Sequence, residues 1–195
     1  LKGNLLTLDD QERNEGKQAL AHGLEIAGIM GVGAILVHPG QLTVDGTYQA
    51  VWDNLVTDIK DLVDLAKRKQ VAISLENVWN KFLLSPKEMR EIIDEIDSEW
   101  VGAYLDTANM MAYGYPEQWI RELGARIKRV HFKDFNRREH RFVNLLDGDT
   151  DWPVIMDELR RIGYDSTLIH EVGGDRQTLV ELGDQSFAPR SGMIC

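Results

Sequence analysis

Short apolar runs alternate with longer amphipathic segments along most of the chain, and this alternation restricts the fold more than any other feature of the sequence. Each apolar run has the length of one buried strand. Between the runs, apolar residues recur at helical spacing, as Val51, Leu55 and Ile59 do. Regular alternation of strand and helix is typical of parallel strands with helical crossovers, so the sequence predicts the α/β class. The expected strands cover residues 34–40, 71–78, 101–109, 129–135 and 167–174.

The expected helices carry start and stop signals. Residues 85–88 read SPKE, a capping box with proline at the first helical position. Gly31 follows a first helix that begins near Asp9, and Gly163 closes a helix over residues 152–163. These signals place the helices between the expected strands, as the α/β class requires.

Polar side chains mark the carboxyl ends of four expected strands. Glu76, Asp106, His131 and Glu171 each lie at or near the point where a strand ends. Carboxyl ends of parallel strands share one edge of a sheet, and ligands bind at that edge. Three carboxylates gathered there would repel one another and lose hydration without a counter-ion. The pattern therefore predicts one divalent metal ion bound by these four residues.

The ligand types narrow the choice of metal. Oxygen ligands with one imidazole suit Mn²⁺, Mg²⁺ or Co²⁺, whereas a structural zinc more often has thiolates or several histidines. Each residue also has an ordinary explanation, since an aspartate at a strand end usually caps a turn and a lone strand histidine usually packs in the core. Four such residues at one edge favour the metal site.

Two further residues are candidates for substrate contact. His38 in the sequence VHPG lies at the same edge, where it contacts substrate or a second metal, or else caps the turn that follows. Lys133 lies two residues after His131 and shares its face of the strand. It reaches substrate oxygens or a phosphate, or it pairs with a carboxylate of the site.

The composition argues against several partners. The chain has 32 acidic and 22 basic residues and a net charge of −10, which repels a phosphate backbone, so no nucleic acid is expected. No apolar run reaches transmembrane length and no signal peptide is visible, so no membrane is expected. Cys195 is the single cysteine and cannot form an intrachain disulfide, which agrees with a cytoplasmic location.

Four motifs resemble those of a known family. LENVWNKF, YLDTAN, VHFKDFNR and LIHEVGG occur in this order and contain the four predicted metal ligands. Together they resemble the sugar phosphate isomerase/epimerase family, a xylose isomerase-like TIM-barrel group that includes ketose 3-epimerases and hexulose-phosphate isomerases. The resemblance covers about residues 5–182.

The resemblance implies a (β/α)8 TIM barrel of which this chain holds strands four to eight. About the first three βα units would be lacking, residues 1–182 would form the carboxyl-terminal portion of the barrel, and residues 183–195 an irregular tail. A short extra strand is allowed near residues 142–145. Five or six strands cannot close an eight-stranded barrel. We therefore expect either an open sheet whose edges pair with another chain, as in a homo-oligomer, or a piece of a longer protein.

The resemblance also implies roles for individual residues. Glu76, Asp106, His131 and Glu171 would bind the metal, and the two glutamates would form an acid/base pair. Arg137, six residues after the metal histidine, would contact substrate.

Two positions depart from the pattern of ketose 3-epimerases. Asn109 stands where those enzymes have a substrate-binding histidine, and is the corresponding candidate contact here. Phe82 stands where they have a second glutamate. Both departures count against a free-ketose epimerase and leave the metal ligands unchanged.

The implied function is a metal-dependent sugar or sugar-phosphate isomerase or epimerase, with a small-molecule sugar as its partner. The two glutamates would move a proton through an enediolate. An endonuclease IV-like DNA-repair nuclease shares the barrel and is an alternative, although it needs more histidines and an acidic chain repels DNA. An inactive truncated family member is a further alternative.

Overall fold

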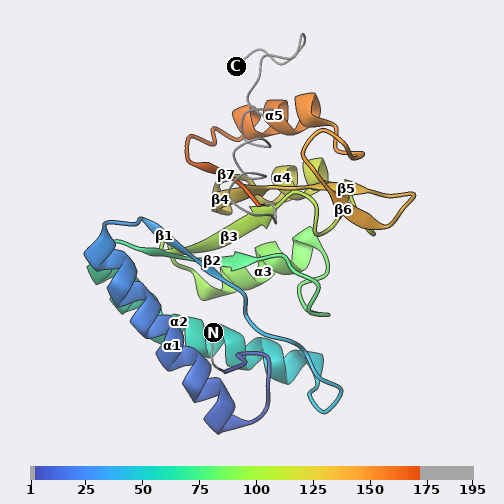
Figure 1. The fold of residues 1–195 in the computed structure, drawn as a ribbon. Helices are drawn as coiled ribbons and strands as arrows, with labels where there is room; N and C mark the ends of the chain where they lie inside the picture. The colour runs from blue at the N-terminus through green and yellow to red at the C-terminus, as the bar shows by residue number, and fades with distance from the viewer. Residues whose placement is uncertain (1–2, 172–195) are drawn as a thin grey trace, which may run out of the picture.

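The computed structural model describes residues 3–171. The expected tail at residues 183–195 and the end of the last expected strand lie outside this range. Figure 1 shows helices and strands that alternate along the described chain. They are α1 (Asp10–Met30), β1 (Ala34–Val37), α2 (Tyr48–Lys69), β2 (Ala72–Glu76), α3 (Pro86–Ile96), β3 (Val101–Asp106), α4 (Pro116–Leu123), the 3-10 turn η1 (Gly124–Arg126), β4 (Ile127–Phe132), β5 (Asp134–Asn136), β6 (Arg141–Val143), α5 (Trp152–Arg161) and β7 (Leu168–His170).

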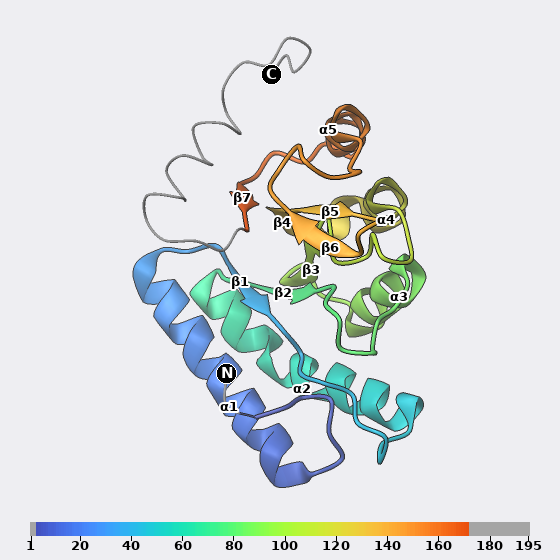
Figure 2. The same ribbon diagram turned by 45° about the vertical axis from the view of Figure 1, so that its right-hand side comes forward.

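Five strands form one parallel sheet in the order β1-β2-β3-β4-β7, which confirms the predicted class. Figure 2 shows helices α2 to α5 following one face of this sheet, so the strands curve with the helices on their outer side. Every strand in the series points the same way. Their carboxyl ends therefore meet at one edge.

The helix signals read from the sequence are confirmed. Ser85 and Glu88 form the reciprocal capping box at the start of α3, with Pro86 in the first turn. Helix α1 ends at Gly31, whose φ of 70° lies in the left-handed region that glycine adopts without strain. These caps satisfy backbone groups that a helix end otherwise leaves unpaired.

The core lies between the sheet and its outer helices. Leu75 and Leu105 of the strands, and Leu55 and Ile59 of α2, are fully buried there. Burial of side chains of this size stabilises the fold by about 1.5–3 kcal/mol each relative to exposure. The apolar face of α2 thus holds the helix against the sheet, and this packing helps to fix the positions of β2 and β3.

The expected extra strand near residues 142–145 was wrong in its placement. Arg141–Val143 is a strand, but it pairs antiparallel with Asp134–Asn136 in a separate two-stranded sheet. The physical reason is proximity. β5 begins only two residues after β4 ends, and the turn between β5 and β6 brings β6 back alongside β5 instead of the main sheet. This β5–β6 hairpin projects from the carboxyl end of β4.

The sheet has two edges within the described residues, β1 and β7. Leu36 on β1 and Ile169 on β7 are each more than a third exposed. The open sheet agrees with the expectation from the strand count, while pairing with a second chain stays a prediction. No helix within residues 3–171 is long and apolar enough to cross a membrane.

Candidate metal centre and active site

The four predicted ligands converge at the carboxyl edge of the sheet. Glu76 ends β2, Asp106 ends β3, His131 lies near the end of β4 and Glu171 follows β7 directly. One ligand atom from each residue lies within 4.8 Å of those of the other three. The parallel register places Asp106 beside His131, so the convergence follows from the sheet itself.

His131 links the two glutamates. Its Nδ1 lies 3.1 Å from Oε1 of Glu76 and 3.5 Å from Oε2 of Glu171. The Tyr104 ring packs against the imidazole with 4.4 Å between centroids. Burial raises the pKa of Tyr104 to about 12, and the Glu76 carboxylate adds to this shift. Tyr104 is therefore a neutral phenol whose ring packs against the imidazole.

Asp106 is completely buried, and only one of its two carboxylate oxygens accepts hydrogen bonds. Its Oδ1 accepts hydrogen bonds from the backbone N–H groups of Ala108 and Asn109. Its Oδ2 is buried without a hydrogen-bond partner among the described residues. Burial raises the pKa of Asp106 to about 7, the nearby Lys133 ammonium opposes the shift, and the neighbouring Glu171 carboxyl group adds to it. Burial also acts to raise the pKa of Glu171, but the neighbouring Asp106 and Lys133 side chains outweigh burial and lower that pKa.

These residues fit a divalent cation. Three carboxylates and one imidazole supply hard oxygen ligands and one nitrogen, and Oδ2 of Asp106 accepts no hydrogen bond from any described residue. A buried carboxylate oxygen without a partner is costly, and a metal bond removes that cost. The donor set agrees with Mn²⁺, Mg²⁺ or Co²⁺.

Asn109 bonds to the segment that follows β2. Its side-chain Nδ2 donates to the backbone carbonyl of Asn77 at 2.9 Å, and its backbone carbonyl accepts from Nε1 of Trp79 at 2.5 Å. The side chain is buried. These contacts tie the segment after β3 to the segment after β2, while the predicted substrate contact of Asn109 stays a prediction.

Lys133 pairs with the site carboxylates, one of the two roles expected from its position. Its Nζ lies 3.1 Å from Oε2 of Glu171 and 3.8 Å from Oδ2 of Asp106. The ammonium also lies over the ring of Phe142, 4.3 Å from the centroid. Lys133 and Glu171 border a hollow of about 560 Å³ under the β5–β6 hairpin. Its other lining residues are Asn136, Glu139, Arg141, Phe142, Val143, Asn144 and Asp147.

Arg137 is bound to a neighbouring loop. Its two terminal nitrogens donate to the backbone carbonyls of Met111 and Gly114, at 2.6 Å and 2.8 Å. The guanidinium lies over the Tyr115 ring, 4.7 Å from its centroid. These contacts hold the loop after β3, a role that the sequence motif did not predict. Substrate contact by Arg137 is still a prediction.

Two other positions have plain structural roles. Nδ1 of His38 accepts a hydrogen bond from the backbone N–H of Gly40, so His38 caps the turn after β1, as one of the two expectations stated. Phe82 is buried against Tyr48 and Trp52 of α2, and the departure from the epimerase pattern there fills the core.

Comparison with known proteins places this arrangement in a family. Residues 1–189 match the family described as the xylose isomerase-like TIM barrel. The chain belongs to this family. The predicted resemblance is confirmed, and the described sheet is an arc of a (β/α) barrel with its helices outside.

Individual relatives are distant in sequence. An uncharacterized protein of Methanocaldococcus jannaschii is 24% identical over 179 residues, which are 85% of this chain and 59% of that protein. The chain thus spans less than two thirds of that curated relative. The crystal structure of a D-tagatose 3-epimerase-like protein is 22% identical, with a TM-score of 0.81 over 94% of this chain and 71% of that one. The IolI protein with a bound zinc atom is 18% identical, with a TM-score of 0.77 over 95% of this chain and 75% of that one.

Asp134 is an organising residue of the barrel edge that sequence analysis missed. It is fully buried, and its carboxylate accepts hydrogen bonds from the loop between β6 and α5. Gly148 belongs to this loop, and a Cβ there would lie 2.2 Å from Oδ1 of Asp134. The donors are the N–H groups of Phe135, Leu146, Gly148 and Thr150, the hydroxyl of Thr150 and Nε1 of Trp152. The DG pair at residues 147–148 was a usable turn signal.

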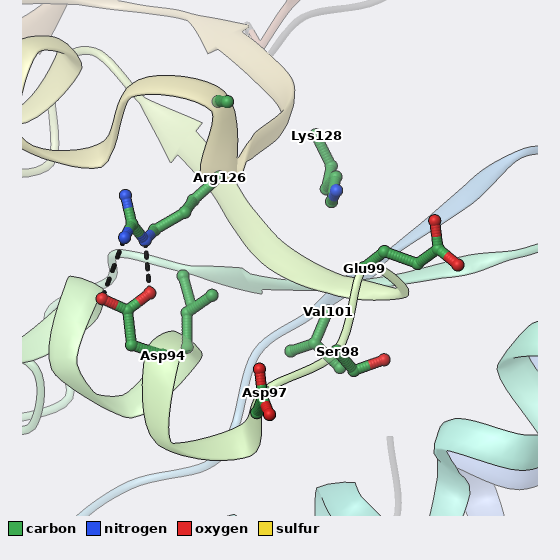
Figure 3. Close-up of a pocket in the computed structure, with 9 residues that line it drawn as sticks. Asp94, Asp97, Ser98, Glu99, Val101, Arg126 and Lys128 are labelled. Atoms are coloured by element: carbon green, nitrogen blue, oxygen red, sulfur yellow. Dashed lines mark hydrogen bonds and ion pairs between the residues drawn. The ribbon is translucent and has the colours of Figure 1, made fainter.

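A second hollow lies at the opposite end of the barrel strands. Figure 3 shows Arg126 facing Asp94, with two dashed bonds between guanidinium and carboxylate. Lys128, at the start of β4, lines this hollow of about 520 Å³, and burial lowers its pKa. The amino end of barrel strands is the end concerned with stability, whereas chemistry takes place at the carboxyl end. The metal centre is at the carboxyl end.

Proposed function

We propose that this chain carries the metal centre of a sugar isomerase or epimerase. The observation that supports the proposal is the convergence of Glu76, Asp106, His131 and Glu171 at the carboxyl edge of a xylose isomerase-like barrel. A divalent cation bound there would polarise the carbonyl and hydroxyl oxygens of a sugar. Because the chain spans part of its curated relative, the activity proposed is that of the whole protein.

The two glutamates move the proton. One carboxylate is ionised and takes a proton from the substrate carbon beside the carbonyl, which leaves an enediolate. The other starts protonated and returns a proton, so that the proton count balances. Return to the opposite face of the same carbon inverts it, and delivery to the adjacent carbon isomerises the sugar. Glu76 and Glu171 both lie close to Nδ1 of His131, at 3.1 Å and 3.5 Å, so one substrate bound at this point would be within reach of both carboxylates.

The neighbouring residues suit a polyhydroxylated substrate. Lys133 and the β5–β6 hairpin surround a hollow whose volume lies within the range for small-molecule sites. Its lining offers donors and acceptors together with the Phe142 ring. We propose that this hollow receives the sugar or sugar phosphate, with Lys133 and Arg141 as the cations in its lining. The similarity to a D-tagatose 3-epimerase-like structure supports a sugar substrate.

Proton exchange tests this function. The intact protein, incubated in D₂O with Mn²⁺ and a panel of ketoses and ketose phosphates, should introduce deuterium beside the carbonyl of its substrate. Exchange should stop when the metal is chelated. Glu76→Gln and Glu171→Gln should each reduce the exchange rate by about 10²–10⁴-fold, because each removes a general base. Wild-type exchange by either metal-loaded variant would contradict the two-glutamate mechanism.

The nuclease alternative receives less support. The cluster found among residues 3–171 contains a single histidine. Asn109 replaces a histidine that the nuclease pattern requires, and its amide is committed to the Asn77 carbonyl. The net charge of −10 also opposes binding to DNA.

A further inference from the structure

Lys133 presents its ammonium to the oxygens that a metal would need. Nζ lies 3.8 Å from Oδ2 of Asp106, the oxygen without a hydrogen-bond partner, and 3.1 Å from Oε2 of Glu171. Only 18% of the lysine side chain is exposed, so its charge is poorly screened by solvent. A divalent cation and this ammonium therefore compete for the same two carboxylates.

A divalent cation and the Lys133 ammonium repel each other when both lie beside these oxygens. Like charges at such separations repel strongly where water is excluded. Nζ lies over the Phe142 ring in the same position, and the lysine borders the adjoining hollow, so the ammonium can move from the carboxylates into the hollow and stay against the aromatic face. An aromatic face stabilises a cation without drawing on a carboxylate.

We propose that Lys133 is an internal counter-ion of the metal site, displaced from the carboxylates into the adjoining hollow when a divalent cation binds, with the Phe142 ring still beside it. The proposal rests on the metal centre of the proposed function. In the displaced position the ammonium donates its hydrogen bonds to an oxygen of the substrate. Metal binding then prepares the substrate pocket as well as the reacting centre, and the two ligands bind cooperatively.

Metal affinity is the first test. Lys133→Met keeps most of the apolar stem and removes the charge. Lys128→Met is the matched control, because it removes the same charge near the start of β4, whereas Lys133 follows the end of that strand (Figure 3 shows Lys128). Titration calorimetry with Mn²⁺ at low salt should show about tenfold tighter binding to Lys133→Met, and a change of about twofold or less for the control.

Two further readouts use the same proteins. Without metal, Lys133→Met should melt at a lower temperature than the wild type, and Mn²⁺ should remove this deficit. In the wild type, saturation with Mn²⁺ should increase acetylation of Lys133 by a small reagent several-fold relative to Lys128, as measured by mass spectrometry, because the freed amine faces the hollow. This last measurement needs no variant.

The outcomes separate this inference from the proposed function. Unchanged or weaker Mn²⁺ binding by Lys133→Met, or Lys133 acetylation that does not rise with metal, would overturn the counter-ion role and leave the metal centre standing. A wild-type protein that binds no divalent cation would overturn both.

Discussion

The side-chain amide of Asn77 forms two hydrogen bonds with the backbone of Asp106. Nδ2 donates to the Asp106 carbonyl at 3.0 Å, and Oδ1 accepts from the Asp106 N–H at 2.8 Å. Asn77 directly follows Glu76, so this reciprocal pair joins the ends of β2 and β3, where each strand carries a candidate metal ligand. The distance between the two carboxylates is therefore fixed by a third residue.

Replacement of Asn77 by alanine should weaken both the fold and the metal site. The change leaves a buried N–H and a buried carbonyl of Asp106 without partners, which costs about 1–3 kcal/mol. Metal affinity should fall by about 10–100-fold, the usual effect of losing a residue that supports a ligand. Urea denaturation and Mn²⁺ titration measure the two effects. A variant with wild-type affinity would show that the strands alone position the ligands.

Gly148 should not tolerate a side chain. A Cβ at this position would lie 2.2 Å from Oδ1 of Asp134 and 2.8 Å from the carbonyl of Phe135. Gly148→Ala should lower the free energy of unfolding by about 1–3 kcal/mol, because the loop must shift to admit the methyl group. Gly23→Ala in α1 is the control. Its Cβ would meet only a side-chain atom at 4.0 Å, so it should stabilise the helix by about 0.5–1 kcal/mol. Equal effects of the two changes would contradict the close contact.

The convergence of the four candidate metal ligands was predictable because the position of each depends on one local rule. A polar residue at the carboxyl end of a buried parallel strand lies at the common edge of the sheet, and four strand ends are visible in the sequence. The capping box at Ser85 and the glycine at position 31 are local in the same sense. No long-range contact had to be known for any of these predictions.

The hairpin and its anchor were not predictable in this way. Strands β5 and β6 have three residues each, too short for period-2 alternation to show, and β6 is mostly exposed. Asp134 accepts hydrogen bonds from groups 12 to 18 residues further along the chain, and most of these donors are backbone N–H groups, which any residue type except proline supplies. Arg137 was predicted as a substrate contact, but its bonds to two loop carbonyls depend on the path of the loop after β3.

Arg137→Ala should therefore affect stability as well as substrate binding. The change releases the carbonyls of Met111 and Gly114 and the cation–π contact with Tyr115, at a cost of about 1–3 kcal/mol. Arg137→Lys should recover only part of the lost stability, because an ammonium cannot reach both carbonyls with the geometry of a guanidinium. Thermal denaturation measures this. If Arg137→Ala keeps wild-type stability and raises only KM, the arginine is a substrate contact with no structural role.

The ion pair between Arg121 of α4 and Glu158 of α5 should make stability depend on acid pH. Oε1 of Glu158 accepts from Nη2 of Arg121 at 2.8 Å, and this bond, against the opposing effect of burial, lowers the pKa of Glu158 below its ordinary 4.5. A carboxyl group whose pKa is lower in the folded state than in the unfolded state stabilises the fold. This contribution is fully present above about pH 4.5 and is lost as the pH falls through the pKa of the folded state.

Glu158→Gln should accordingly be less stable than the wild type at neutral pH, with a difference that narrows on acidification below about pH 4.5. Glu91→Gln, which removes a more exposed carboxylate, is the control and should show little change. Urea denaturation across this pH range measures the difference. A gap between wild type and Glu158→Gln that stays constant with pH would contradict the assignment.

Metal binding by the wild type and by Asp106→Asn tests the central claim most directly. Asparagine keeps the shape of the side chain and can still accept the two backbone bonds, but it removes the charged oxygen assigned to the cation. Asp94→Asn, at the opposite end of the barrel strands, is the control. Calorimetric titration with Mn²⁺ should show one bound ion for the wild type and the control, and affinity at least about 100-fold weaker for Asp106→Asn. A wild type that binds no ion, or an Asp106→Asn variant that binds it as tightly, would contradict the account.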